Sequence, residues 1–241
     1  MLITGLVIAC TLFLLGVILS GGTTTALFNV PALIIVLGAT FGLALAQSDR
    51  RRLRLVGKRL TTLHLPYVPP YQENDLVVWA QTARKEGRLA LEPVAQGVTD
   101  TLAAQGLQCL IDGAEPDDIE HFVNVAMVAE EERELQVAEF LEQLAIYAPL
   151  MSAIAAVIVV LQSAAQPTNP LLSQIGFFNA GVTLVYGLML SAIVFLPLAS
   201  RTRWLARCQY RCRETLLDAL LSISRNEPPR RLSDRLAYRS K

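Results

Sequence analysis

Charged residues are absent from two long stretches of this 241-residue sequence. Residues 1–48 and 143–200 contain no Asp, Glu, Lys or Arg, so all 21 basic and 21 acidic side chains lie in residues 49–142 and 201–241. A helix that crosses a bilayer needs roughly 20 mostly apolar residues, and each uncharged stretch has room for two. Together with 53% hydrophobic residues and a mean hydropathy of +0.42, this pattern predicts an all-α, polytopic membrane protein with four transmembrane helices.

The sequence also lacks the residue groups that catalysis or metal binding would need. It has two histidines and four cysteines, and no Gly-rich phosphate loop, nucleophile elbow or metal-ligand cluster. Cys208 and Cys212 stand four residues apart on a predicted helix, but no third ligand is near them, which disfavours zinc. We therefore expect no enzyme activity, no bound metal and no cofactor, and we expect no nucleic-acid partner.

The uncharged stretches divide into two hairpins. The predicted helices are residues 2–19, 30–47, 145–162 and 175–198. No charge lies in their connectors, which are Ser20–Asn29 and Ser163–Gln174 (with a turn at Pro167–Ser173), whereas arginines follow the second helix from Arg50 and the fourth helix from Arg201. By the positive-inside rule, both termini and both charged regions lie in the cytoplasm.

This gives the predicted domain organisation. The four parts are a transmembrane hairpin at 1–48, a helical cytoplasmic domain at 49–142, a second hairpin at 143–200 and a basic cytoplasmic tail at 201–241. In the cytoplasmic domain we expect helices at about Glu73–Glu86 and Leu89–Gln105, then a long helix that begins at Pro116 and continues into the third span. The tail should be helical to about Ser224 and loose after it.

The few polar residues of the second hairpin lie on defined helix faces. Asn179, Thr183 and Tyr186 stand at i, i+4 and i+7, which puts them on one face of the fourth span. The third span has a stripe of mostly small side chains at the same spacing: Ala148, Ser152, Ala155, Ala156 and Val159. Such faces are typical of a lined intramembrane path or of a tight helix interface in which the polar groups bond to neighbouring helices.

No span contains a carboxylate, an amine or an imidazole. A charge at the bilayer centre costs from about 2.5 to more than 10 kcal/mol, so such groups persist only where function needs them. The chain therefore has no titrating group for a proton relay of its own. If it belongs to an ion pathway, the group that carries the ion must come from another subunit.

The order of parts, together with several short motifs, resembles one known family. The matching stretches are Asn29–Thr40, Ala83–Glu92, Ala148-Pro149, Tyr186-Gly187, Pro197 and the tail Leu216–Pro228. They resemble the MotA/PomA flagellar motor stator subunits, within the MotA/TolQ/ExbB proton channel superfamily, over nearly the whole chain. The resemblance implies a multi-pass protein of the bacterial inner membrane that acts in flagellum-dependent motility and chemotaxis.

The resemblance also implies partners and residue roles. Five such chains would form a ring in the membrane lipid around a dimer of a MotB-like, single-span, peptidoglycan-binding subunit, whose aspartate takes the ion. Arg84 and Glu92 fall on the charged pair that faces the rotor switch protein, and Pro149 and Pro197 on two prolines that couple conformational change. The ion path would be lined at Ser152, Ala156, Asn179, Thr183 and Tyr186.

The chain departs from the family pattern at two positions of this path. Ala156 stands where the family has a threonine hydroxyl, and the family's paired threonines appear as Thr183-Leu184. Sodium needs several oxygen ligands, so these losses favour protons as the transported ion. Two alternatives stay open: a TolQ/ExbB-like energising channel, which has one span before the cytoplasmic part where this chain has two, and a non-conducting MotA-like membrane scaffold.

Overall fold

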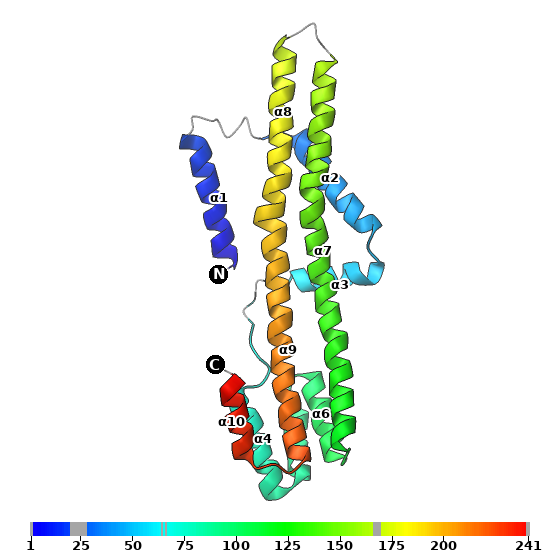
Figure 1. Cartoon of the computed structure of the whole chain (residues 1–241), viewed down its shortest axis with the longest axis vertical. Helices are drawn as coiled ribbons and strands as arrows, with labels where there is room; N and C mark the ends of the chain where they lie inside the picture. The colour runs from blue at the N-terminus through cyan, green and yellow to red at the C-terminus, as the bar shows by residue number, and fades with distance from the viewer. Residues whose placement is uncertain (1, 20–27, 64, 66, 166–169, 240–241) are drawn as a thin grey trace. The chain divides into compact units, whose positions relative to one another are not determined.

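The computed structural model describes residues 2–19, 28–63, 65, 67–165 and 170–239. All regular secondary structure in these residues is helical, which confirms the predicted all-α class (Figure 1). The chain divides into two compact units, which we call unit 1 (Met1–Leu65 and Leu135–Arg203) and unit 2 (Pro66–Glu134 and Trp204–Lys241). Each is described by itself below.

Unit 1 begins with three helices: α1 (Leu2–Leu19), α2 (Val30–Ala46) and α3 (Arg50–Leu60). Asn29 caps α2 by accepting a hydrogen bond from the N–H of Ala32, and Pro31 stands in the first turn as predicted. The basic run after α2 was not predicted as a helix, but Asp49 accepts a bond from the Arg50 N–H and α3 follows. Residues 20–27 of the predicted connector lie outside the described residues.

The rest of unit 1 comes from two long helical runs. The first is α7 (Pro116–Ala164), and the second consists of α8 (Pro170–Met189), the π-helix η3 (Leu190–Phe195) and α9 (Leu196–Ser224). The prediction that one helix runs from Pro116 into the apolar stretch is confirmed. Of the predicted turn Pro167–Ser173, residues 167–169 lie outside the described residues.

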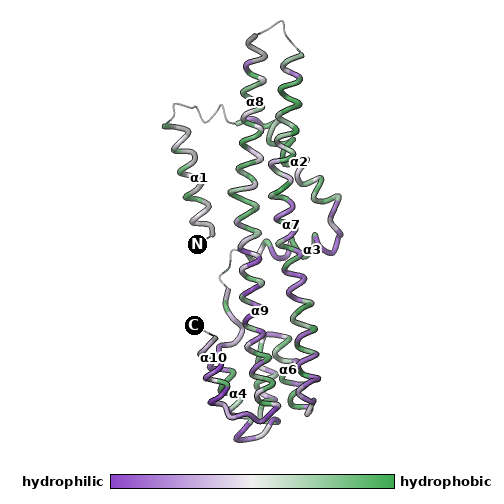
Figure 2. The backbone as a smooth tube through the Cα atoms, viewed as in Figure 1, coloured by the Kyte–Doolittle hydropathy of each residue, from purple (hydrophilic) through white to green (hydrophobic). Residues whose placement is uncertain are grey.

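Hydrophobic residues dominate α2, α8 and the C-terminal half of α7, as Figure 2 shows. Two helical segments of the described residues, Pro116–Ala164 and Gln174–Ser224, are long and apolar enough to cross a membrane. The helix Val30–Ala46 is apolar but shorter. The four-span arrangement stays a prediction.

Unit 2 holds a separate hydrophobic core. Its own helices are α4 (Glu73–Glu86), the 3₁₀ helix η2 (Arg88–Leu91), α5 (Glu92–Gly97), α6 (Thr101–Ile111) and α10 (Pro229–Arg239), and parts of α7 and α9 complete it. Leu76, Leu91, Leu107, Ile119 and Leu220 are fully buried between them. The predicted helix at Glu73–Glu86 is confirmed.

Two predictions in unit 2 are wrong. The expected helix at Leu89–Gln105 is divided into η2, α5 and α6, because Pro93 opens a new helix and the extended Val98 ends it after Gly97. The expected loose tail instead forms α10, because Leu232 and Leu236 stand one turn apart and both are buried in the core.

Candidate functional site

The C-terminal half of α7 packs very closely against α8. A Cβ atom at Gly187 would overlap the side chain of Ser152 and the carbonyl oxygen of Ala148, so only glycine fits there without movement. Near the other end of the pair, a Cβ atom at Gly176 would overlap Ser163. Small residues of this kind let two helix backbones approach in a membrane protein.

These two contacts define the register of the pair. Ser152 and Ser163 are eleven residues apart on α7, and so are Gly176 and Gly187 on α8. The helices are therefore antiparallel in one constant register, which places Ala156 level with Thr183. Both side chains are buried, with 3% and 1% of their surface exposed. The predicted small-residue stripe thus lies on α7 and forms a tight interface with α8.

The polar stripe of α8 bonds to the start of α2. The backbone N–H of Asn29 donates to the hydroxyl of Tyr186 at 2.9 Å, and the Asn29 side-chain amide donates to the Asn179 side-chain carbonyl at 3.1 Å. Asn29 therefore joins two of the predicted residues while it also caps α2. Such bonds are expected if these polar groups hold neighbouring helices together. That the residues line an ion path stays a prediction.

The Thr183 and Ser152 hydroxyl groups donate within their own helices. Thr183 Oγ1 donates to the Asn179 carbonyl at 2.7 Å, and Ser152 Oγ donates to the Pro149 carbonyl at 2.9 Å. Ser152 has no exposed surface. The structure thus brings the five predicted path residues together on α7 and α8, with Ser152, Ala156 and Thr183 inside the interface and Asn179 and Tyr186 half-buried beside α2.

Both predicted coupling prolines lie within the two long helical runs. Pro149 lies inside α7, and Pro197 lies in the first turn of α9, directly after the π-helix η3. A proline removes the N–H that would bond one turn back, and π-turns often mark functional positions. Sequence analysis missed η3, since nothing in the spacing of apolar residues marks a π-turn in a helix of this composition.

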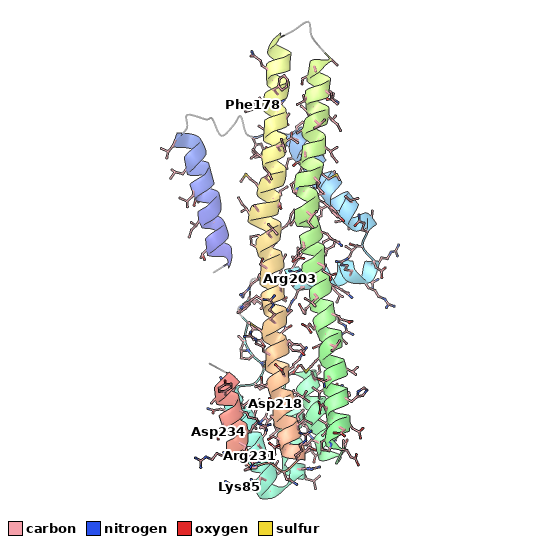
Figure 3. All side chains as sticks on the ribbon, in the orientation of Figure 1. Lys85, Phe178, Arg203, Asp218, Arg231 and Asp234 are labelled. Atoms are coloured by element: carbon pink, nitrogen blue, oxygen red, sulfur yellow. The ribbon has the colours of Figure 1, made fainter. Side chains whose placement is uncertain are left out.

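The predicted rotor-facing residues both belong to unit 2. Arg84 is exposed in the last turn of α4, next to Lys85, which Figure 3 labels, and Glu92 is exposed at the start of α5. Gly87 separates α4 from η2 with a φ angle of +90°, a conformation that favours glycine. Leu91, the last residue of η2, has no exposed surface, so its side chain fixes this loop to the hydrophobic core.

Sequence analysis also missed Arg88, which anchors the same loop. Its guanidinium donates to the carbonyl oxygen of Ser224, the last residue of α9, at 2.8 Å. A cation at a helix C-terminus satisfies one of the last carbonyls and complements the helix dipole. Arg88 therefore fixes η2 between the two exposed charges.

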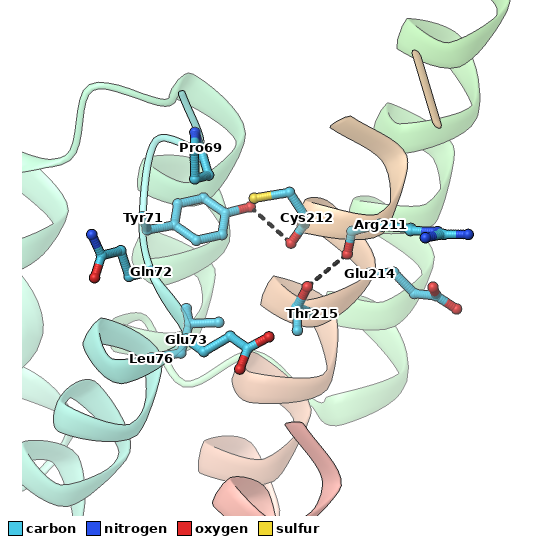
Figure 4. A pocket seen from close by; sticks show the side chains of 9 residues that line it. All are labelled: Pro69, Tyr71, Gln72, Glu73, Leu76, Arg211, Cys212, Glu214 and Thr215. Carbon is cyan, nitrogen blue, oxygen red and sulfur yellow. Dashed lines mark hydrogen bonds between the residues drawn. The ribbon is translucent and has the colours of Figure 1, made fainter. Parts of the chain in front are cut away.

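A pocket of about 740 Å³ opens in unit 2 between the segment before α4 and the middle of α9 (Figure 4). Tyr71 and Cys212 form part of its wall, and the Tyr71 hydroxyl donates to the Cys212 carbonyl at 3.2 Å. Burial raises the pKa of Tyr71 above its ordinary range, and the nearby Cys212 thiol raises it further. The phenol therefore stays protonated and keeps its role as a donor.

The described residues contain no group of three or more His, Cys, Asp or Glu side chains that could hold a metal ion. The one pair of thiols considered in the sequence, Cys208 and Cys212, is present as free cysteines. The candidate site is therefore a helix interface with polar edges, together with an exposed charged loop.

Comparisons with known proteins agree with this architecture. A family model described as the MotA/TolQ/ExbB proton channel family matches residues 94–214. Motility protein A of Bacillus subtilis (strain 168) is 25% identical over 244 residues, which cover 96% of this chain and 87% of that protein. Motility protein A of Aquifex aeolicus (strain VF5) is 27% identical over 229 residues, which cover 92% of this chain and 89% of that protein.

Solved structures have the same fold. The C. jejuni MotAB structure matches with a TM-score of 0.91 and 22% identity, and the match covers 98% of this chain and 93% of that one. The flagellar MotAB stator complex from Bacillus subtilis matches with a TM-score of 0.89 and 23% identity, over 97% of this chain and 93% of that one.

Proposed function

Because the chain belongs to the MotA/TolQ/ExbB proton channel family, we propose that it is a stator subunit of the bacterial flagellar motor. With a MotB-like partner it forms a proton channel, and proton flux through this channel generates torque on the flagellar rotor. The observation that carries the proposal is the extent of the similarity: the relatives named Motility protein A match along nearly the whole chain, and not over the channel-family region alone.

In the proposed topology, the chain crosses the inner membrane four times and both termini lie in the cytoplasm. The two long apolar segments support the second hairpin, and α1 and α2 would form the first. Large apolar side chains such as Leu161, Phe177 and Phe178 are more than 45% exposed in the single chain, as expected for surfaces that face lipid or other subunits. The arginines that follow the second and fourth predicted spans, together with the uncharged connectors, agree with termini in the cytoplasm.

The proposed channel takes its titrating group from the partner. Residues 143–200 contain no carboxylate, amine or imidazole, so an aspartate of the single-span partner must accept and release the proton. Ala156 lies level with Thr183 and supplies no second hydroxyl there. This shortage of oxygen ligands favours protons over sodium, since sodium needs several oxygens in place of its hydration shell.

Torque would pass to the rotor through the loop that carries Arg84 and Glu92. The two side chains are exposed, carry opposite charges and stand on either side of the anchored η2. A surface with both signs of charge can pair with complementary charges on a rotor switch protein. In the proposed complex, five copies of the chain surround the partner.

Two other functions are alternatives to this one. A TolQ/ExbB-like energising channel belongs to the same family, but it is disfavoured because two helices, α1 and α2, precede the central region here, where those proteins have one span. A non-conducting membrane scaffold is favoured by Ala156 and by the exposed Leu184, which replace hydroxyl-bearing residues of the family pattern.

Co-purification followed by flux measurement tests the proposal. The chain would be expressed together with the single-span protein of the same organism, and the complex reconstituted in vesicles with a pH-sensitive dye inside. We expect proton flux that disappears when the partner's intramembrane aspartate is replaced by asparagine. A stable complex without any flux would favour the scaffold, and a strict sodium requirement would contradict the ion assignment.

A further inference from the structure

One hydrogen bond joins the π-helix η3 to α7. Ser191 lies in η3, and its Oγ donates to the carbonyl oxygen of Ala145 on α7 at 2.6 Å. Ser152 and Thr183 behave differently, because each donates to a carbonyl of its own helix. The Ser191 bond therefore crosses between two helices, and it reaches a backbone carbonyl rather than a side chain.

The carbonyl that accepts this bond has lost its own donor. In an α-helix the carbonyl of Ala145 would accept from the N–H of residue 149, four positions on, but Pro149 has no N–H. Ala145 is only 4% exposed, so water cannot replace the missing donor freely. A buried carbonyl without a donor is costly, and in membrane helices nearby Ser or Thr side chains can satisfy groups that a proline frees.

The register of the two helices accounts for the choice of donor. The register that places Ser152 opposite Gly187 also places Ser191 level with Ala148. A helical carbonyl points toward the C-terminus of its helix, so the oxygen of Ala145 reaches toward this level, where the N–H of residue 149 would otherwise be. Ser191 is thus the residue of the second run that lies beside the freed carbonyl.

We propose that Ser191 is a positioning residue whose hydroxyl takes the place of the N–H that Pro149 lacks. It holds the Pro149 turn of α7 against η3, and η3 ends at Phe195, two residues before Pro197. One side chain therefore connects the turn of α7 that contains Pro149 to the π-helix that directly precedes the turn of Pro197. The inference goes beyond the proposed motor function, because it depends only on the packing of the two helices.

A double-mutant cycle tests this assignment. Ser191→Ala, Pro149→Ala and the double variant would be purified as the full-length chain in complex with its partner, and their melting temperatures compared with the unmodified protein. With Pro149 present, Ser191→Ala leaves the Ala145 carbonyl without a donor and should lower the melting temperature by about 2–12 °C. In the Pro149→Ala background, the alanine supplies an N–H that bonds to Ala145, and the same Ser191→Ala change should have little effect.

Thr202→Val provides the matched control. Thr202 is fully buried in the same unit and donates to the Leu198 carbonyl of its own helix, so its loss should cost the same with Pro149 present as in the Pro149→Ala background. An equal effect of Ser191→Ala in both backgrounds would overturn the proposal.

A second comparison decides the question if Pro149→Ala does not give a folded protein. Ser191→Thr keeps the hydroxyl, so it should melt higher than Ser191→Ala and support more swimming when both are expressed in place of the unmodified chain. A threonine variant that melts no higher than the alanine variant would refute the role of the hydroxyl. Loss of swimming without any change in melting temperature would also contradict it, since a positioning bond must contribute to stability.

Discussion

Gly187→Ala tests the close contact between α7 and α8 directly. The added Cβ would overlap Ser152 and the Ala148 carbonyl, and the latter is backbone that cannot rotate away. Overpacking of this kind typically costs about 1–3 kcal/mol. Alanine also has a higher helix propensity than glycine by about 1 kcal/mol, which would offset part of this loss. A single variant therefore cannot separate the two effects.

Gly181→Ala separates them, because Gly181 is exposed on the same helix and a Cβ atom there would meet nothing within 4 Å. Both variants gain the same helix propensity, so the difference between them isolates the overlap at Gly187. For a chain of this length, about 1 kcal/mol corresponds to roughly 2–4 °C in melting temperature. We therefore expect Gly187→Ala to melt about 2–12 °C below Gly181→Ala.

The assay is thermal unfolding of the purified chain in detergent, followed by far-ultraviolet circular dichroism. The reasoning is refuted if the two alanine variants melt at the same temperature. A further variant that also carries Ser152→Gly should recover part of the difference only, because the overlap with the Ala148 carbonyl persists.

Three further predictions follow from other parts of the chain. Arg84→Glu should weaken swimming and leave assembly in the membrane unchanged, and restoration by a charge reversal on the rotor protein would identify the contact; unchanged swimming would count against the rotor-facing assignment. Asn29→Ala removes the α2 cap and the bond to Asn179, so we expect the free energy of unfolding to fall by about 1–3 kcal/mol in thermal unfolding. An unchanged free energy of unfolding would show that these bonds do not stabilise the chain. Leu232→Ala should cost about 2–5 kcal/mol and expose α10 to proteolysis, and a tail as resistant as the unmodified one would show that α10 is not held by that side chain.

The long helices of this chain could be predicted from the sequence, because each extends over a long stretch of uniform composition or helical spacing. The absence of charge from residues 143–200 predicted two apolar helices, and the acidic start at Pro116 predicted the beginning of α7 correctly. Short signals failed: the helix expected at Leu89–Gln105 is broken, because a proline and an extended residue interrupt it within a few positions. The tail helix α10 depends on burial of Leu232 and Leu236 against other segments, which local sequence does not reveal.

The candidate site shows the same division. Helical spacing grouped Asn179, Thr183 and Tyr186 on one face of α8, but it could not show that Thr183 is buried against α7 or that Asn29 bonds to the other two. That contact joins residues about 150 positions apart in the chain. Ser191 was missed for the same reason, since its partner carbonyl belongs to a different helix and is free only because of Pro149.

The burial of the α7–α8 interface limits where an ion path could run in the proposed channel. Ser152, Ala156 and Thr183 have 0–3% of their surface exposed within a single chain, so an ion could reach them only if the two helices separated. The Thr183 hydroxyl hydrogen is also committed to the Asn179 carbonyl. Asn179 and Tyr186 are half-buried in the single chain and lie outside this interface, beside Asn29. A proton path that uses this chain as a fixed wall must therefore pass along the edge formed by Asn179 and Tyr186, whereas a path through Ser152 and Thr183 requires α7 and α8 to part during each passage.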